Sequence, residues 1–297
     1  MTFCTAILFL IAAAGAALGS DAAPRLEIDP AAPAPGEVFS VRVADLPGNG
    51  PYEAVLGEAR FPLWPTAGGW EGLGAVDRDA APGVRTLELR AMPAPGGAGA
   101  GRLLAAREIA VGTRHYPEQR IAVSEALVTL SPEDQARADR EAARIRAALA
   151  GRSDRRLWEG SFRVPAEGPF SSPFGVRRIY NDKPRGYHGG LDIAAPRGAP
   201  VLAAAAGRVA LAGDFFYTGN TVFLDHGLGL FTAYFHLDRL AVEEGEALGA
   251  GRLLGLVGST GRSTGPHLHW GVYVSGIRAD PVSLLRVAGG GVGGDGP

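Results

Sequence analysis

Alternation of apolar and polar residues marks the first third of the chain as β-structure. Every second side chain is apolar in the segments 37–43 and 85–91, which places on one face Phe39, Val41 and Val43, and Leu87, Leu89 and Ala91. Turns are indicated by clusters of Pro and Gly at 33–36, 47–50 and 82–83. We therefore expect a β-sandwich-like N-terminal domain over residues 24–112.

A second β-rich region begins near Trp158. Strands are expected at 207–211, 221–224, 230–236 and 267–274. In the last of these, His267 and His269 leave one face, and the intervening Leu268 and the following Trp270 point the other way into a core. The chain is therefore predicted to be mainly β, with a second domain over 158–287.

The same alternation places Tyr234 and His236 on one face of their strand, so His236 is expected to face the same side as the other histidines.

One helix is predicted between the two β-regions. Ser131 supplies an N-cap hydroxyl, Pro132 occupies the first helical position, and acidic residues follow. The run rich in Ala and Arg continues to Leu149 and ends at Gly151. Its charges are interpreted as a solvated face, and the helix as part of a linker over 113–157.

The chain begins with an apolar stretch that has the form of a secretory signal. Residues 3–18 are almost wholly apolar and small residues follow, so we expect removal of residues 1–23, although no Lys or Arg precedes the stretch. An uncleaved membrane anchor is the alternative, which the short length of the run disfavours. Cys4, the sole cysteine, lies at the beginning of the apolar run and not at its end, so it is not placed for lipidation, and the mature chain is expected to have no disulfide. Segments 92–101 and 288–297 are expected to be a flexible loop and a disordered tail.

Composition narrows the class of protein. The chain has 297 residues, of which 46% are hydrophobic and 20% charged, as is ordinary for a soluble protein of about two domains. Its net charge of −2 and the absence of Lys/Arg runs argue against nucleic acid as a partner. No stable membrane insertion is expected once the signal is removed. The 44 glycines and 22 prolines suit short strands joined by turns better than a helical bundle.

Candidate chemistry is concentrated between residues 188 and 269. Four of the six histidines lie at its two ends and in the segment 234–237, namely His188, His236, His267 and His269, and Asp192 follows the first of them. Neutral imidazoles and a carboxylate are ligands that zinc accepts. Nothing structural requires two histidines side by side on one strand face, where their desolvation costs on the order of a few kcal/mol. The set therefore predicts a zinc site, whereas the isolated His115 and His226 are interpreted as hydrogen-bonded core residues.

The surroundings of these residues are those of loops that enter strands. His188 and Asp192 are four residues apart, but Gly189, Gly190 and Pro196 indicate a loop and not a helix at this point. The pair is therefore distinct from the two zinc-binding histidines that some proteases place four apart on a helix. The Gly-rich segment 258–265 lies directly before a strand, and no Gly-Lys-Ser/Thr follows it, so it is not a phosphate loop. We expect it to form a rim that hydrogen-bonds an extended peptide.

Three separated motifs resemble peptidase family M23, the lysostaphin- and LytM-type zinc metallopeptidases. The motifs are His188-x-x-x-Asp192, Tyr-x-His-Leu at 234–237 and Gly-Pro-His-Leu-His at 265–269, within a similarity over roughly 161–285. This resemblance implies a C-terminal antiparallel β-sheet catalytic domain of LytM type and cleavage of peptide bonds in peptidoglycan.

The resemblance also implies a role for each residue of the set. The zinc ligands are then His188, Asp192 and His269, and the non-ligand catalytic histidines are His236 and His267. Zinc held in this way acidifies bound water to a pKa of about 7 and polarises a peptide carbonyl, and one non-ligand histidine takes the water proton. The sequence leaves open which of the two is the general base.

The expected function is that of an exported zinc metalloendopeptidase, a peptidoglycan hydrolase in the periplasm or cell envelope. The alternative, from a different class, is a non-catalytic envelope protein that binds peptidoglycan or activates another hydrolase. The intact set of five residues favours the enzyme. The bond cleaved, the wall chemistry, the role of the N-terminal domain, the oligomeric state and any regulatory partner are not determined by the sequence.

Overall fold

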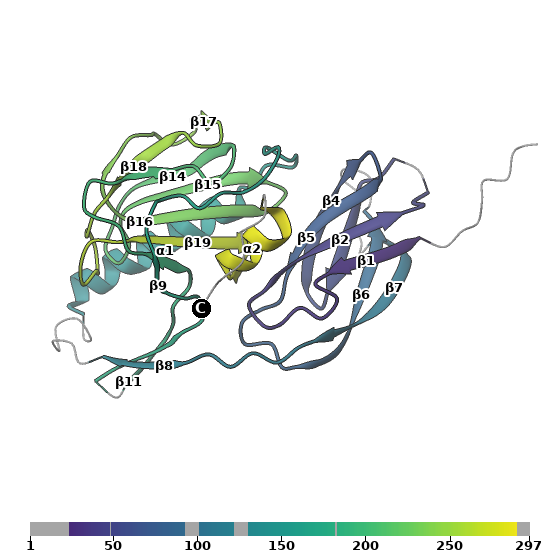
Figure 1. Ribbon diagram of the computed structural model, residues 1–297, viewed down its shortest axis with the longest axis horizontal. Helices are drawn as coiled ribbons and strands as arrows, with labels where there is room; N and C mark the ends of the chain where they lie inside the picture. Colours follow the sequence, from purple (N-terminus) through teal and green to yellow (C-terminus); the bar gives the residue numbers. More distant parts are fainter. Residues whose placement is uncertain (1–23, 48, 93–100, 122–129, 182, 290–297) are drawn as a thin grey trace, which may run out of the picture.

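The computed structural model describes residues 24–47, 49–92, 101–121, 130–181 and 183–289. The expected signal at 1–23 lies outside these residues, as do most of the expected loop at 92–101 and most of the expected tail. Two β-domains lie against each other, with helix α2 (Pro281–Ala288) between them (Figure 1). No helix in the described part of the chain is long and apolar enough to cross a membrane. The prediction of a mainly β chain is confirmed.

The N-terminal domain contains seven strands in the order β1-β2-β5-β4-β3-β6-β7. Their bounds are β1 Arg25–Asp29, β2 Val38–Ala44, β3 Tyr52–Leu56, β4 Ala59–Thr66, β5 Gly69–Ala75, β6 Gly83–Ala91 and β7 Arg102–Val111. The side chains expected on the inner faces of the two predicted strands are buried, Ala91 only partly, and join one core with Phe61. Alternation thus identified both strands and their inward faces correctly.

The C-terminal domain is built on a large antiparallel sheet in the order β17-β14-β15-β16-β19-β12-β9, with β13, β18 and β20 attached beside this path. The bounds are β9 Phe170–Ser172, β12 Leu191–Ile193, β13 Pro200–Leu202, β14 Gly207–Phe215, β15 Gly219–Gly227, β16 Leu230–Leu240, β17 Ala247–Leu248, β18 Leu253–Val257, β19 Leu268–Val274 and β20 Ile277–Ala279. All four predicted strands are present. Three of them extend further than predicted because hairpin pairing continues the ladder beyond the alternating residues.

The central strands separate two cores. Leu268 and Trp270 are fully buried on one side, as expected from their alternation with the histidines. On the other side Phe223, Phe235 and Tyr273 form a smaller aromatic cluster. The side chain of His269 extends from this second side, where it stacks on the ring of Phe235.

Helix α1 (Pro132–Ala150) covers the aromatic cluster. Its N-cap hydroxyl on Ser131 accepts from the Asp134 amide, and Gly151 ends it, as predicted. Apolar residues of its last two turns pack against the cluster, and the helix also contacts β14. Arg140, Arg144 and Arg146 are exposed as expected, whereas Arg137 is partly buried and pairs with Asp214 of β14 at 2.9 Å.

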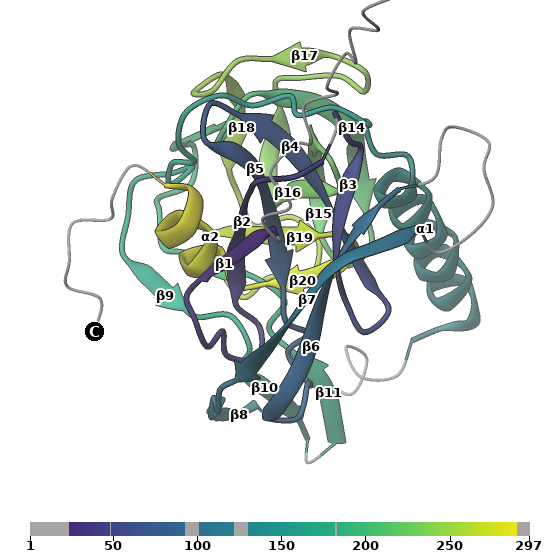
Figure 2. The ribbon, with the colours of Figure 1, turned by 90° about the vertical axis from the view of Figure 1, so that its right-hand side faces the viewer.

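A small three-stranded sheet lies at the edge of the C-terminal domain. It has the order β11-β10-β8, with β8 Glu118–Ile121, β10 Arg177–Tyr180 and β11 Lys183–Tyr187. Strand β8, which precedes the helix in sequence, pairs in parallel with β10 (Figure 2). Part of the expected linker is therefore a strand of this small sheet.

The two domains share polar and apolar contacts around α2 (Pro281–Ala288). The hydroxyl of Ser283 accepts from the buried Val38 amide at 2.8 Å. Trp64 and Trp158 meet edge to face with ring centroids 5.3 Å apart. Val38 and Ser40 on the outer side of β2 are consequently buried as well, which alternation within β2 did not predict, whereas Arg42 on the same side is exposed.

The two isolated histidines differ. His226 is fully buried and bonded to the Ala206 carbonyl at 2.8 Å and to Thr232 Oγ1 at 2.7 Å, so its interpretation as a core residue is confirmed. The same interpretation is wrong for His115, which is exposed. His115 lies in an extended connection between β7 and β8, whose lack of periodicity gave no indication of the face that it occupies.

Candidate metal centre

Three potential ligands converge where β11, β12 and β19 meet. His188 directly follows β11, and antiparallel pairing sets Asp192 of β12 opposite His269 of β19. Asp192 Oδ1 lies 2.9 Å from His188 Nε2 and 2.8 Å from His269 Nδ1, and the two ring nitrogens are 2.9 Å apart. The side chains are 2%, 11% and 12% exposed in chain order. Among the described residues, these three form a group whose ligand atoms lie close enough together, within 4.8 Å of one another, to hold one metal ion.

The proton positions around His188 favour a bound cation. Its Nδ1 lies 2.8 Å from the Pro173 carbonyl, which can only accept, so in the neutral ring Nδ1 carries the proton. The lone pair of Nε2 then faces a carboxylate oxygen 2.9 Å away, and neither atom can donate. Tetrahedral zinc ligands at about 2.0–2.2 Å from the ion are on the order of 3.3 Å from one another. The donor set fits zinc after an adjustment of a few tenths of an ångström.

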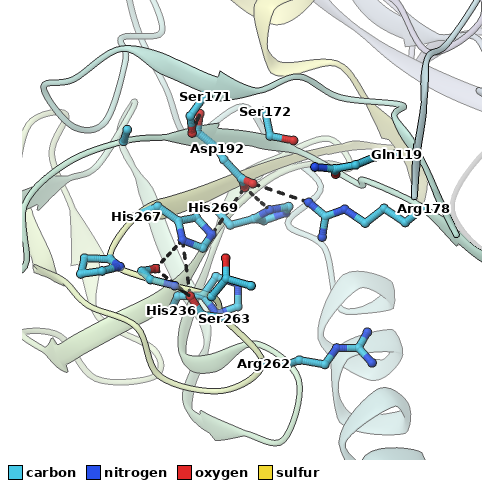
Figure 3. A pocket seen from close by; sticks show the side chains of 14 residues that line it. Gln119, Ser171, Ser172, Arg178, Asp192, His236, Arg262, Ser263, His267 and His269 are labelled. Atoms are coloured by element: carbon cyan, nitrogen blue, oxygen red, sulfur yellow. Dashed lines mark hydrogen bonds and ion pairs between the residues drawn. The ribbon is translucent and has the colours of Figure 1, made fainter. Parts of the chain in front are cut away.

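Asp192 is held in its ionised form. Burial acts to raise its pKa, but the contacts with His188 and His269 outweigh burial and hold the pKa well below its usual range. Its second oxygen, Oδ2, lies 3.6 Å from the guanidinium of Arg178 (Figure 3). All the short contacts with the histidines go to Oδ1, so one oxygen is directed at the ligand cluster and the other at the arginine.

His236 reaches the cluster through a local break in strand geometry. The expectation that it shares a face with Tyr234 is wrong, because the Tyr234 hydroxyl lies in the core and accepts from the Ala204 amide at 3.0 Å. The His236 ring instead faces His267, with ring centroids 4.9 Å apart. The backbone of His236 is left-handed, with φ of 62°, which interrupts the two-residue alternation of β16.

His236 and His267 each bind a backbone carbonyl through one ring nitrogen, Nδ1. Nδ1 of His236 lies 2.8 Å from the Thr260 carbonyl, and Nδ1 of His267 lies 2.8 Å from the Gly265 carbonyl. Both Nδ1 atoms therefore carry the proton in the neutral rings, which leaves Nε2 as an acceptor. Burial lowers the pKa of His236 to about 4, so its ring is neutral near pH 7. Nε2 of His267 lies 3.7 Å from Asp192 Oδ1 and adjoins the cluster.

A cleft of about 380 Å³ opens over these residues (Figure 3). The Gly-rich loop supplies part of its wall through residues 262–265, which supports its expected place on the rim. Gln119 of β8 and Arg178 of β10 line another part of the wall. The five predicted site residues thus lie together, with His236, His267 and His269 along one side of the cleft and Asp192 beside them.

Sequence reasoning missed several neighbours of the cluster. Arg178 is indistinguishable from other exposed arginines until β10 is placed beside Asp192. Phe235 follows an ordinary strand pattern, yet its ring stacks on His269 with a centroid separation of 5.1 Å and an interplanar angle of 2°. The Tyr-x-His-Leu motif contains Phe235, and its position next to a candidate catalytic residue was the available indication.

Comparison with known proteins agrees with this site. The model of peptidase family M23 matches residues 186–281, which include all five site residues. A DD-carboxypeptidase/endopeptidase, Mpg, of Neisseria meningitidis serogroup B is 44% identical over 114 residues, 38% of this chain and 26% of the relative. Peptidoglycan DD-endopeptidase ShyA of Vibrio cholerae is 38% identical over 124 residues, 41% of this chain and 28% of the relative. The chain thus spans about a quarter of the length of these curated relatives.

One solved structure extends the similarity to both domains. A Pseudomonas aeruginosa protein assigned to peptidase M23 is 32% identical, with a TM-score of 0.66. The match covers 86% of this chain and 96% of that protein. Both the ligand cluster and the whole-chain similarity therefore lead to one assignment: the chain belongs to peptidase family M23.

Proposed function

We propose that this protein is an exported zinc metalloendopeptidase that hydrolyses peptide bonds in peptidoglycan, in the periplasm or cell envelope. The observation that carries the proposal is the pair of facing acceptors, His188 Nε2 and Asp192 Oδ1, with His269 Nδ1 completing the triangle. Family membership and the names of the Neisseria and Vibrio relatives support peptidoglycan as the substrate class.

The proposed zinc ligands are His188, Asp192 and His269. Two neutral imidazoles and one carboxylate leave the ion with a net positive charge, with which zinc, when bound, polarises a peptide carbonyl and acidifies water. Asp192 contributes its charge because its pKa is well below neutrality. The Nδ1–H of His188 donates to the Pro173 carbonyl, which keeps Nε2 free and fixes the direction of its lone pair.

We assign His236 and His267 to proton transfer and charge stabilisation. In its neutral form each ring presents Nε2 as an acceptor, because each ring is held by a bond from Nδ1–H to a backbone carbonyl. A neutral histidine in such a position can take a proton at Nε2 and return it to the leaving amine. Its protonated form can stabilise the oxyanion of the tetrahedral intermediate. The two roles are not divided between the residues.

We also retain the proposed organisation of the chain, with an N-terminal domain at 24–112, a linker at 113–157 and the peptidase domain at 158–287. The open cleft is compatible with an extended peptide, since the loop at 258–265 provides backbone groups and hydroxyls at one wall. The anchoring of this loop supports that use, because Thr260 Oγ1 donates to the Leu237 carbonyl at 2.8 Å.

The test is digestion of purified sacculi by the mature, zinc-loaded protein, with chromatography and mass spectrometry of the released muropeptides. Alanine at any of the three proposed ligands should abolish release and remove most of the zinc, because two remaining ligands leave the ion largely to water. Replacement of the exposed His115 by alanine is the matched control and should leave both unchanged. Full zinc retention in all three ligand variants would refute the site, and absence of peptide cleavage by the zinc-loaded protein would refute the activity.

A further inference from the structure

The short segment 173–176 holds His188 on three sides. The Pro173 carbonyl accepts from Nδ1 of the ring at 2.8 Å. The Gly175 amide donates to the His188 carbonyl, and the His188 amide donates to the Val176 carbonyl, each at 2.8 Å. Both the backbone of His188 and the rotation of its ring therefore depend on the position of this one segment.

The outer side of the segment is held by residues from the first half of the chain. The guanidinium of Arg78 donates from Nη2 to the Gly175 carbonyl at 2.9 Å, and its side chain is only 14% exposed. The same guanidinium lies 4.6 Å from the ring centre of Tyr116 and 4.8 Å from that of Tyr187, the residue before His188. Arg78 thus contacts both the segment 173–176 and Tyr187, the residue that directly precedes His188.

Tyr116 forms the wall against which Gly175 lies. A Cβ added to Gly175 would come within 1.9 Å of the Tyr116 ring, so the backbone is pressed directly onto the aromatic side chain. The ring also meets Phe174 edge on, with centroids 6.2 Å apart. The hydroxyl of Tyr116 donates to the Pro35 carbonyl at 2.6 Å, which fixes the ring to the N-terminal domain.

We propose that Arg78 and Tyr116 are positioning residues for the ligand His188, so that docking of the N-terminal domain sets the metal affinity of the site. The proposal rests on the metal site of the proposed function and goes beyond it, because neither residue touches the ligand cluster. The two act through segment 173–176, which fixes which ring nitrogen carries the proton and where Nε2 points.

The expected size of the effect follows from how strictly metal sites depend on ligand geometry. Loss of an outer partner that orients a ligating histidine weakens metal binding by roughly 10–100-fold. Arg78 is one step further out, because it orients the carbonyl-bearing segment and not the ring itself. We therefore expect about tenfold weaker zinc binding on removal of its hydrogen-bond donors.

The experiment compares variants of the whole protein that are shown to be folded. Arg78→Met keeps the aliphatic stem and removes the donors, and Arg78→Lys keeps a cation that can reach the same carbonyl. Ser283→Ala is the matched control, since it removes a different interdomain hydrogen bond, to the Val38 amide, that does not involve segment 173–176. Zinc affinity is measured by competition with a chromophoric chelator, and the ¹⁵N shifts of the His188 ring report its tautomer in the metal-free protein. Chemical unfolding of the metal-free variants measures stability separately.

We expect Arg78→Met to bind zinc about tenfold more weakly and to show mixed His188 tautomers, with Arg78→Lys intermediate. Ser283→Ala should lose stability while its zinc affinity and tautomer match those of the wild type. Equal zinc affinity and tautomer in Arg78→Met and wild type would overturn the proposal, as would an equal loss of affinity in Ser283→Ala. A wild-type protein that binds no zinc would instead refute the proposed metal site, so the two failures are distinguishable.

Tyr116 provides a second, independent test. Tyr116→Phe keeps the ring against Gly175 and loses only the bond to Pro35, so its zinc affinity should stay within about threefold of wild type, since the outer partners of the histidine are retained. Tyr116→Leu removes the aromatic wall and should weaken zinc binding as much as Arg78→Met does. If Tyr116→Leu folds and binds zinc as tightly as Tyr116→Phe, the ring has no positioning role.

Discussion

Replacement of Gly190 by alanine should remove metal binding while the closely matched replacement of Gly189 does not. The two glycines are adjacent in the connection from His188 to Asp192, yet their surroundings differ. A Cβ on Gly190 would lie 2.4 Å from the Trp270 carbonyl oxygen and 2.6 Å from Nε2 of His269. A Cβ on Gly189 would meet only the side chain of Arg278, at 3.4 Å, which is ordinary van der Waals contact.

The expected loss of zinc affinity follows from how far the His269 ring or the Gly190 backbone has to move to make room for the added Cβ. To restore ordinary contact at about 3.4 Å, the His269 ring or the Gly190 backbone has to move by about 0.8 Å. Metal ligands need to lie within about 0.2 Å of their ideal distances, so a displacement of this size is equivalent to loss of one ligand. Overpacking against the rigid Trp270 carbonyl should also cost about 1–3 kcal/mol of stability.

The assay is zinc titration of Gly190→Ala, Gly189→Ala and wild type, with unfolding of the metal-free proteins measured in parallel. Gly190→Ala should bind zinc at least 100-fold more weakly, of the order of the effect of removing an orienting partner or more. Gly189→Ala should match the wild type in affinity. If folded Gly190→Ala binds zinc with wild-type affinity, the geometry of the His269 ring against Gly190 has been misinterpreted.

Two further predictions concern histidines with different roles. His236→Ala and His267→Ala should each keep near-stoichiometric zinc and lose roughly 10²–10³-fold or more in the rate of muropeptide release; if His267→Ala loses its metal while His269→Ala keeps it, the ligand assignment is reversed. His226 contributes to acid stability, because burial lowers its folded-state pKa from 6.5 to about 4, as it does for His236 and His269. The folded state then binds fewer protons, so its contribution is complete above pH 6.5 and falls by up to about 3 kcal/mol as the pH drops to 4. His226→Asn should flatten this part of the stability profile of the metal-free protein, and an unchanged pH dependence would contradict the assignment.

Local sequence patterns predicted the secondary structure correctly where a segment follows a single periodicity. Alternation predicted β2 and β6 with their inward faces, because a half-buried strand has to bury every second side chain. The capping residues Ser131 and Gly151 predicted α1 closely, because the free amides and carbonyls at helix ends need such partners. The three motifs, taken together with the family resemblance, also pointed to five candidate residues, and the structure brings these five together.

Only the tertiary structure decided how these segments act on one another. The left-handed backbone of His236 redirects its ring toward His267, a change that alternation cannot express. Arg178 and Arg78 look like any surface arginine in the sequence, and contacts across 14 residues to Asp192 and 97 residues to Gly175 give them their partners. The sequence by itself thus predicted which histidines and aspartate lie together and which segments form strands and helix. Their directions, their proton positions and their support from the N-terminal domain depend on long-range packing, because those properties are set by neighbours that no local pattern contains.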